Sequence, residues 1–288
     1  MNGQNHQNGT STHSTGSLEA ALQDAKPNHM KAQLAAGAVV SAMSIRYSRG
    51  IEIVGYAAAA KMDGVLIDLE HSSIDLDQCA QFTLAALAHG ITPVVRVPSL
   101  ASSYVARALD GGAQGIIMPH AETAADATAC AKAAKFFPDG NRSAIGGLAA
   151  LGYGAHATID ANRAVNGQVL TIIMIETLAA LDNLEQIAAV PGVDVLLIGT
   201  NDLTAQYEIP GQHDDTRITQ AYQRVIDVCR KSNKAVGIGG LYARQDLIDK
   251  FVKMADGIGR FVMCGSDQDY VLEGARRTAK WLDSYNDA

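Results

Sequence analysis

The sequence predicts a single (β/α)₈ barrel, the α/β fold known as the TIM barrel, with a disordered N-terminal tail. Short apolar runs rich in Val and Ile recur along the chain, and Ala-rich amphipathic stretches lie between them. Continuous apolar runs are typical of parallel strands that are covered on both faces. Eight such units fit in 288 residues, a length at which α/β barrels form one domain. No Gly-x-Gly-x-x-Gly motif follows the first run, which disfavours an open doubly wound sheet.

The order of the elements follows from the alternation of the two patterns. The expected strands are Gly37–Met43, Gly64–Asp68, Thr92–Arg96, Gly115–Met118, Thr171–Ile175, Val195–Ile198, Ala235–Gly239 and Phe261–Cys264. The expected helices include Leu76–His89, Ser102–Gly111, Thr123–Lys135, Leu178–Val190, Arg217–Ser232, Arg244–Met254 and Gln268–Tyr285.

Two segments fall outside this alternation. Residues 1–27 are polar and show no hydrophobic period, so they are expected to form a disordered tail, and residues 28–288 the catalytic barrel. Residues 137–167 form a longer polar insertion after the fourth strand's helix. Loops of that length in a compact domain are often functional.

Composition excludes several classes of function. A net charge of −7 gives no nucleic-acid-binding footprint. The four cysteines lie far apart and form no zinc-type spacing, which favours a reducing compartment. No apolar run is long enough to span a bilayer, and the N-terminus has no secretory-signal pattern. We therefore expect a cytoplasmic protein that binds neither membrane nor nucleic acid.

Polar residues follow the predicted strands directly, at the end of the barrel where catalytic groups collect. A carboxylate that ends an apolar strand is costly to desolvate and persists when it has a metal, a charge partner or strong donors. Such residues are Asp68, Glu70 and His71 after the second strand, Arg96 after the third, His120 after the fourth, Glu176 after the fifth and Asp202 after the sixth.

Glu176 and Asp202 follow adjacent strands and can therefore converge. Two carboxylates without a convergent sulfur or imidazole pair suit Mg²⁺ or Mn²⁺, with water and substrate as the remaining ligands. Each residue alone could instead cap the following helix. Together, at neighbouring strand ends, they favour a metal site.

Arg96 and His71 are the candidates for binding and proton transfer. A guanidinium at a strand end can bind the carboxylate of a 2-oxo acid through two hydrogen bonds, or it can form an internal ion pair with Asp68 or Glu70. His71 can act as a general base because its ordinary pKa lies near neutrality. His120 occupies a comparable place and is the weaker candidate. Asp110, before two glycines, looks first like the end of a helix.

Five ordered motifs resemble the HpcH/HpaI aldolase family, over roughly residues 37–280. They are Asp68-Leu69-Glu70-His71, Pro93-Val94-Val95-Arg96-Val97-Pro98, Leu109-Asp110-Gly111-Gly112-Ala113-Gln114-Gly115, Ile175-Glu176-Thr177 and Ile198-Gly199-Thr200-Asn201-Asp202-Leu203.

The resemblance implies a class II pyruvate aldolase, a carbon–carbon lyase that needs a divalent metal, Mg²⁺ or Mn²⁺. Glu176 and Asp202 would hold the metal, and Arg96 would bind the carboxylate of pyruvate and stabilise the enolate oxygen. The backbone of Thr200, Asn201 and Asp202 would line the pyruvate pocket.

The resemblance also implies a proton-transfer group. His71 would be the general base, Asp110 would pair with it and orient it, and Glu70 would lie near a metal-bound water. A homo-oligomer is implied as well, a hexamer in which the C-terminal helix packs on a neighbour.

Two positions depart from the family pattern. Met174 stands where these aldolases often carry Gln, and the usual Gly-x-Arg-Gly reads Gly140-Asn141-Arg142-Ser143. Both changes bear on the acceptor more than on the pyruvate half of the site.

The expected reaction is reversible aldol cleavage of a 2-oxo acid through a pyruvate enolate, with oxaloacetate decarboxylation as a related activity. The acceptor, an aldehyde or another compound, is not specified by the residues. Three alternatives remain: an enzyme like macrophomate synthase that joins the enolate of oxaloacetate to a larger acceptor, an acyl-CoA lyase like citrate lyase, and a non-catalytic barrel that binds a metabolite.

Overall fold

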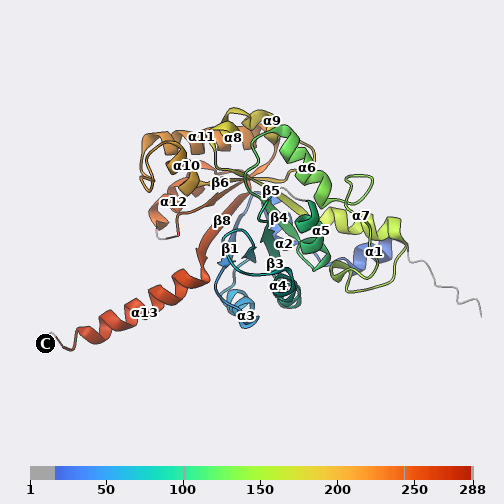
Figure 1. Ribbon diagram of the computed structural model, residues 1–288, viewed down its shortest axis with the longest axis horizontal. Coiled ribbons are helices and arrows are strands. Elements are labelled where there is room, and N and C mark those ends of the chain that lie inside the picture. The colour runs from blue at the N-terminus through green and yellow to red at the C-terminus, as the bar shows by residue number, and fades with distance from the viewer. Residues whose placement is uncertain (1–16, 100–101, 243, 287–288) are drawn as a thin grey trace, which may run out of the picture.

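The computed structural model describes residues 17–99, 102–242 and 244–286, and it contains a closed barrel of eight parallel strands with helices around it (Figure 1). The strand order is β1 to β8 without crossing, so the predicted (β/α)₈ fold is confirmed. The strands are β1 (Val39–Ile45), β2 (Gly64–Asp68), β3 (Thr92–Arg96), β4 (Gly115–Met118), β5 (Leu170–Ile175), β6 (Val195–Gly199), β7 (Ala235–Gly239) and β8 (Arg260–Ser266).

Strand β1 is the one whose predicted bounds are shifted. It begins and ends two residues later than the expected Gly37–Met43. Gly37 has φ +77° and follows the end of a helix, so the first two residues of the apolar run close that helix instead of starting the strand. Arg46 therefore stands directly after β1, at the catalytic end of the barrel.

The helices largely follow the predicted order. They are α1 (Leu18–Asp24), α2 (His29–Ala35), α3 (Glu52–Ala59), α4 (Leu76–His89), α5 (Ser102–Asp110), α6 (Ala124–Ala134), α7 (Thr158–Gln168), α8 (Leu178–Asp182), α9 (Leu184–Ala188), α10 (Thr200–Gln206), α11 (Thr216–Ser232), α12 (Gln245–Met254) and α13 (Asp267–Asp283), with a 3₁₀ turn at Ala149–Leu151. The expected helix Leu178–Val190 is two short helices, because the chain turns at Asn183.

The prediction of a disordered tail over residues 1–27 is wrong for its last part, residues 17–27, which contains a helix. Residues 1–16 lie outside the described residues, but α1 is a helix that Ser17 caps through its side chain. Ala21 is fully buried, and α1 packs against α7 of the long insertion. The sequence did not reveal α1 because a helix this short shows no clear hydrophobic period. It is stabilised by α7, residues 158–168, which covers its apolar face.

The interior of the barrel is filled by side chains from alternate strand positions, as the two-residue strand period requires. Met30 and Leu34 of α2 close the N-terminal end of the barrel. A Cβ atom at Gly64 would lie 2.7 Å from Cε of Met30, so glycine at this position leaves space for the Met30 side chain. The interior set is Met30, Leu34, Val40, Ala42, Leu66, Val94, Ile117, Leu170, Ile172, Met174, Val195, Leu197, Ala235, Phe261 and Met263.

The cysteines form no disulfide. Cys79, Cys130 and Cys229 are buried, and burial raises the pKa of each thiol to about 12. These thiols therefore serve as small apolar core residues. Within the part of the chain that the structure describes, no helix combines the length and the apolar character needed to cross a membrane.

Candidate active site

The paired side chains Asp68 and Arg96 form the base of the site. They end β2 and β3 in direct register. Leu66 and Val94, two residues earlier, point into the barrel, so Asp68 and Arg96 point into its catalytic end. Arg96 donates to Asp68 through Nε at 2.9 Å and through Nη2 at 2.6 Å. The internal ion pair that the sequence left open is therefore present.

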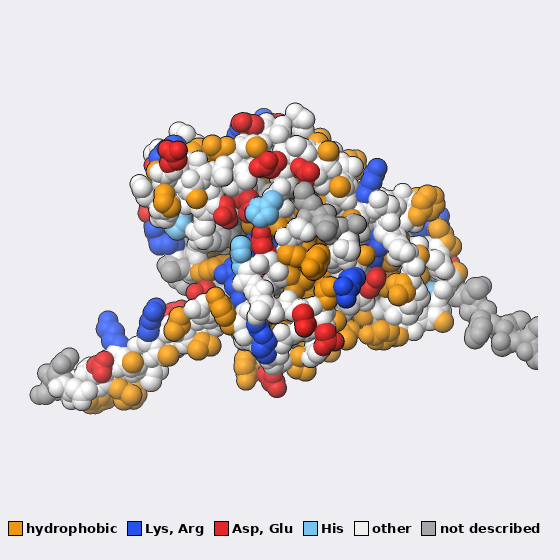
Figure 2. Space-filling view, viewed as in Figure 1, with side chains coloured by type: hydrophobic (Ala, Val, Ile, Leu, Met, Phe, Trp, Pro, Cys, Tyr) orange, Lys and Arg blue, Asp and Glu red, His pale blue; other side chains and the backbone are white. Residues whose placement is uncertain are grey.

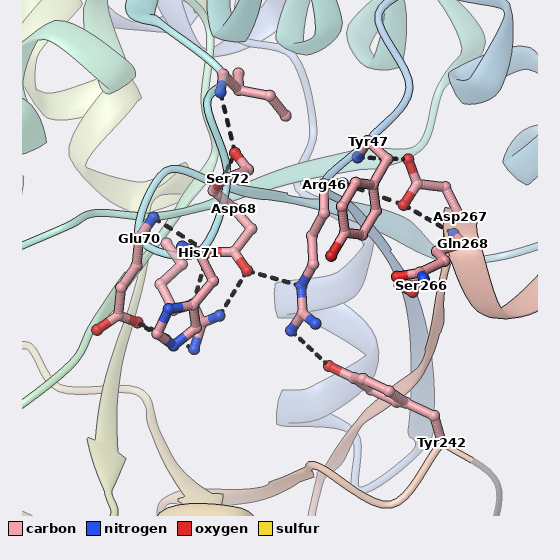
Figure 3. Close-up of polar contacts among 12 residues, drawn as sticks. Arg46, Tyr47, Asp68, Glu70, His71, Ser72, Tyr242, Ser266, Asp267 and Gln268 are labelled. Carbon is pink, nitrogen blue, oxygen red and sulfur yellow. Dashed lines mark hydrogen bonds and ion pairs between the residues drawn. The ribbon is translucent and has the colours of Figure 1, made fainter.

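Asp68 also organises the loop after β2 and reaches β1 (Figure 3). Its carboxylate accepts the backbone N–H of Glu70 at 3.2 Å and of His71 at 3.1 Å, and it accepts Nε of Arg46 at 2.9 Å. Burial alone would raise the pKa of the Asp68 carboxyl. The hydrogen bonds and charge of Arg96, helped by the N–H of His71 and the charge of Arg46, lower this pKa below its ordinary value. Asp68 is therefore an ionised, fully buried carboxylate that bonds to Arg46, Arg96 and the backbone of the loop after β2.

Replacing Asp68 with Asn is expected to destabilise the fold by about 3–5 kcal/mol, because it removes the buried carboxylate charge that Arg96 and Arg46 share. The measurement is the urea midpoint of the purified variant. The control is Asp249→Asn, which removes an exposed carboxylate paired with Lys253 on α12 and should change stability by less than about 1 kcal/mol. Equal stability of the two variants would contradict the role of Asp68.

Glu70 links the arginine to a histidine. Its Oε2 lies 3.1 Å from Nη1 of Arg96, and its Oε1 lies 2.7 Å from Nε2 of His120. His71 lies 3.7 Å from Glu70, with a side chain that is 59% exposed. His120, the weaker candidate from sequence, thus has the closer contact with the buried carboxylates, while His71 is free to approach a ligand from the solvent side.

Glu176 is buried beside the end of β6. Its Oε1 accepts the backbone N–H of His120 at 2.7 Å and lies 3.3 Å from that residue's Nδ1. His120 has φ +57°, a conformation that non-glycine residues adopt mostly at special sites. A Cβ atom at Gly199 would lie 2.8 Å from Cβ of Glu176 and 3.0 Å from its Oε2. Glycine at this position therefore lets the Glu176 carboxylate lie over the end of β6.

The carboxylates at this rim repel one another. The pKa of the Glu176 carboxyl is raised above its ordinary value, mainly by burial. The contacts with His120 act in the opposite direction, and the nearby negative charges of Asp202 and Glu70 add to the rise. Asp68 and Glu70 pair with the guanidinium groups of Arg46 and Arg96, whereas Glu176 and Asp202 have no arginine or lysine partner among the described residues. A divalent cation would neutralise them.

The donor set fits Mg²⁺ or Mn²⁺. Asp202 lies in the first turn of α10 with an exposed side chain, next to the buried Glu176. In the described segments, no three His, Cys, Asp or Glu side chains converge in a set that could hold a metal by themselves. Mg²⁺ is commonly bound through one or two carboxylates and completes its octahedral shell with water and substrate. Glu176 and Asp202 match that pattern.

Thr200 and Asn201 use their side chains within the fold. The hydroxyl of Thr200 lies 2.9 Å from that of Tyr222 on α11, and Oδ1 of Asn201 lies 3.0 Å from Nε2 of His213. Their backbone, which follows β6 at the rim, is the part that a ligand can contact. That the backbone of these residues lines a substrate pocket stays a prediction.

Asp110 does not pair with His71 within the chain, so this expectation needs correction. Its Oδ1 accepts Nη2 of Arg142 at 2.6 Å. Arg142 has a side chain that is 1% exposed and stacks on Phe136, with 4.2 Å from its Cζ to the ring centroid. A buried guanidinium requires a counter-ion, and Asp110 at the end of α5 supplies it.

Sequence reasoning missed two residues of the rim. Arg46 donates to Asp68, and its Nη2 donates to the hydroxyl of Tyr242 at 3.1 Å. Arg46 escaped notice because the first strand was placed two residues early. Tyr242 comes three residues after the end of β7, where an aromatic side chain has no pattern that distinguishes it from core packing.

Comparisons with known proteins identify the family of this chain. The sequence profile of the HpcH/HpaI aldolase/citrate lyase family matches residues 48–273. The 4-hydroxy-4-methyl-2-oxoglutarate aldolase of Chaetomium globosum is 37% identical over 250 residues, which cover 86% of this chain and 92% of that protein. The hydroxypyruvate/pyruvate aldolase of Paraburkholderia phytofirmans is 33% identical over 233 residues, 79% of this chain and 87% of that protein.

A solved structure gives the same result at the level of the fold. The HpcH/HpaI aldolase/citrate lyase family protein from Burkholderia cenocepacia is 28% identical and superposes with a TM-score of 0.77, over 89% of this chain and 99% of that one. The family match begins after β1 and includes the ends of β2, β3, β5 and β6. This chain belongs to the HpcH/HpaI aldolase/citrate lyase family and is a carbon–carbon lyase.

Proposed function

We propose that this lyase cleaves 4-hydroxy-2-oxo acids to pyruvate and a second carbonyl compound, and that Glu176 and Asp202 hold the Mg²⁺ or Mn²⁺ it needs. The observation that carries the proposal is that Glu176 and Asp202, two neighbouring carboxylates at the rim that also holds the buried Arg96, have no arginine or lysine partner among the described residues. The two relatives named above, an aldolase of 4-hydroxy-4-methyl-2-oxoglutarate and an aldolase of hydroxypyruvate and pyruvate, support the substrate class.

Cleavage breaks the C3–C4 bond, and its electron pair becomes the enolate of pyruvate. When bound, the cation supplies a Lewis acid for the carboxylate and the 2-oxo oxygen of the substrate. Arg96, held by Asp68 and Glu70, would donate to the oxygen on which negative charge develops. The backbone of Thr200–Asp202 would line the pocket for the 2-oxo acid.

A base must remove the proton of the C4 hydroxyl as C4 becomes a carbonyl. His71 is exposed at the rim and is the proposed base. His120 would hold Glu70 and Glu176 in place through its contacts at 2.7 Å and 3.3 Å. After the second product leaves, a proton returns to C3 and gives pyruvate.

The test is pyruvate release by chelator-treated protein before and after Mg²⁺ or Mn²⁺ is added. The substrates are oxaloacetate and 4-hydroxy-4-methyl-2-oxoglutarate, which yields two pyruvates per cleavage. Free metal decarboxylates oxaloacetate, so Glu176→Ala protein at the same metal concentration is the control. Metal-dependent release well above that control supports the proposal, and release equal to the control from folded protein refutes it.

His71→Ala is expected to slow aldol cleavage by about 10²–10⁴-fold, the usual effect of removing a positioned general base. Oxaloacetate decarboxylation needs no hydroxyl proton removed and should fall much less. The measurement is kcat/KM for both reactions with the same preparation. Equal losses would contradict the division of roles, and little loss in either reaction would favour His120 as the base.

The C-terminal helix supports a homo-oligomer, such as the hexamer that the family resemblance implies. Helix α13 runs away from the barrel, and Figure 1 shows no other element along most of its length. Asp267 is its one buried residue among those described. Figure 2 shows apolar side chains along this helix. Exposed apolar residues on and after α13 are Tyr270, Val271, Leu272, Trp281, Leu282 and Tyr285.

Such an exposed apolar face is typical of an element that packs on another subunit. An apolar depression of about 290 Å³ beside the start of α13, lined by Met43, Ile53 and Tyr56 among others, would contribute to the contact. Light scattering after size exclusion should show an oligomer for the full chain and a smaller species for Trp281→Glu/Leu282→Glu. A monomeric full chain at micromolar concentration would rule this out.

A further inference from the structure

We propose that Arg46 binds a carboxylate on the departing half of the substrate, so that the preferred substrate is a dicarboxylic 4-hydroxy-2-oxo acid and the second product is itself a 2-oxo acid. This inference rests on the proposed function and names its substrate class. It assigns to Arg46 a role in specificity, separate from the enolate chemistry at Arg96.

Arg46 lies across the barrel end from the proposed cation site. In a closed barrel of eight strands in sequential order, β1 is opposite β5, and Arg46 follows β1 while Glu176 follows β5. Arg96, after β3, lies between them around the rim. A substrate whose 2-oxo acid end binds at Glu176, Asp202 and Arg96 therefore extends its far end toward β1.

The two arginines share one carboxylate. Oδ2 of Asp68 accepts Nη2 of Arg96 at 2.6 Å and Nε of Arg46 at 2.9 Å. Arg96 turns toward Glu70 and Arg46 toward Tyr242, as Figure 3 shows for Arg46. The guanidinium of Arg46 is therefore a second cationic group, one carboxylate away from Arg96.

Among the described residues, the one carboxylate that pairs with the Arg46 guanidinium is shared with Arg96. That carboxylate, Asp68, already accepts two hydrogen bonds from Arg96. Tyr242 does not neutralise Arg46, because burial raises the pKa of the Tyr242 hydroxyl despite the nearby charge of Arg46. Nη1 of Arg46 makes no hydrogen bond with any residue that the structure describes. The side chain is 22% exposed, against 5% for Arg96. A ligand carboxylate would complete its bonding, since guanidinium groups favour that partner.

Arg46 is also held in place from behind. The carboxylate of Asp267, at the start of α13, accepts the backbone N–H groups of Arg46, Tyr47 and Ser48 at 3.2, 3.0 and 2.6 Å. Asp267 is 2% exposed. The Tyr242 ring lies 5.6 Å from Cζ of Arg46 and limits its movement on the other side. A binding group fixed in this way loses little conformational entropy when a ligand arrives.

A purely structural role, in which Arg46 only neutralises Asp68, explains less. Asp68 already has two bonds from Arg96 and two from the backbone of Glu70 and His71. A fifth donor is not needed to satisfy it. The exposed part of Arg46 and its unbonded Nη1 have no function in that account.

The experiment compares two substrates that share the pyruvate half. 4-Hydroxy-4-methyl-2-oxoglutarate has a carboxylate on C4, and 4-hydroxy-2-oxopentanoate has none. Arg46→Gln should lower kcat/KM for the dicarboxylate by about 10–100-fold, mainly through KM, the usual size of a lost charged hydrogen bond. The monocarboxylate should change by less than about threefold. Arg46→Lys, which keeps the charge without the planar fork, should give a smaller loss for the dicarboxylate alone.

The matched control is Arg49→Gln. It removes the same charge from the same loop, but among the described residues this exposed guanidinium bonds to neutral oxygens alone, those of Arg46, Ser48 and Ser73. It should change neither substrate by more than about threefold. Three results would overturn the inference. Arg46→Gln could lose the same activity toward both substrates, Arg49→Gln could lose as much as Arg46→Gln, or the wild-type protein could show no preference for the dicarboxylate. Wild-type protein that cleaves neither substrate would instead refute the proposed function.

Discussion

Glu176→Gln is expected to lower metal-dependent pyruvate release by about 10³-fold or more. The substitution keeps the shape of the side chain and its acceptor for the His120 N–H, but it removes the buried charge that would bind the cation. Loss of the Lewis acid forfeits several kcal/mol of stabilisation, and each 1.36 kcal/mol is a factor of ten in rate. Calorimetric titration with Mn²⁺ should show the matching loss of affinity.

The control for this prediction is Glu185→Gln. Glu185 is an exposed carboxylate on α9 that pairs with Arg224 at 3.5 Å, away from the rim. Its replacement should leave both activity and Mn²⁺ affinity within about twofold of wild type. A Glu176→Gln protein that keeps wild-type affinity for Mn²⁺ would show that the cation binds elsewhere.

Arg96→Lys should reduce kcat/KM for aldol cleavage by about 10²–10³-fold, the usual loss when one donor to a developing oxyanion is removed. Lysine keeps the charge but cannot bond Asp68 through two nitrogens while a third faces Glu70, as Arg96 does. The assay is steady-state cleavage, paired with a urea midpoint to separate loss of activity from loss of stability. Near-wild-type turnover in folded protein would exclude Arg96 from the chemistry. Arg107→Lys, on the exposed side of α5, is the matched control.

Much of the fold could be predicted because parallel barrel strands are buried on both faces and leave an apolar signal. β2, β3, β4 and β7 have the predicted bounds, since a Gly or polar residue flanks each run. β1 was misplaced because the apolar residues that end α2 merge with those of the strand. Hydrophobicity alone cannot separate a helix end from a strand start.

The site was predictable where a charged residue directly ends an apolar strand. Asp68, Arg96 and Glu176 fit that description, and the structure brings their side chains to one rim. The roles of individual partners were not readable, because contacts between loops depend on three-dimensional placement. Asp110 bonds Arg142 from the long insertion, and His120 rather than His71 bridges Glu70 and Glu176.

The most direct test of the account is the exchange of the methyl protons of pyruvate in D₂O, followed by proton NMR. Exchange requires the enolate and no acceptor, so it isolates the half-reaction assigned to Glu176, Asp202 and Arg96. The account predicts rapid exchange by chelator-treated protein after Mg²⁺ or Mn²⁺ is added, and exchange at the buffer rate with Glu176→Gln at the same metal concentration. Exchange by folded wild-type protein no faster than the metal-containing buffer would contradict the assignment of this site to pyruvate enolate chemistry.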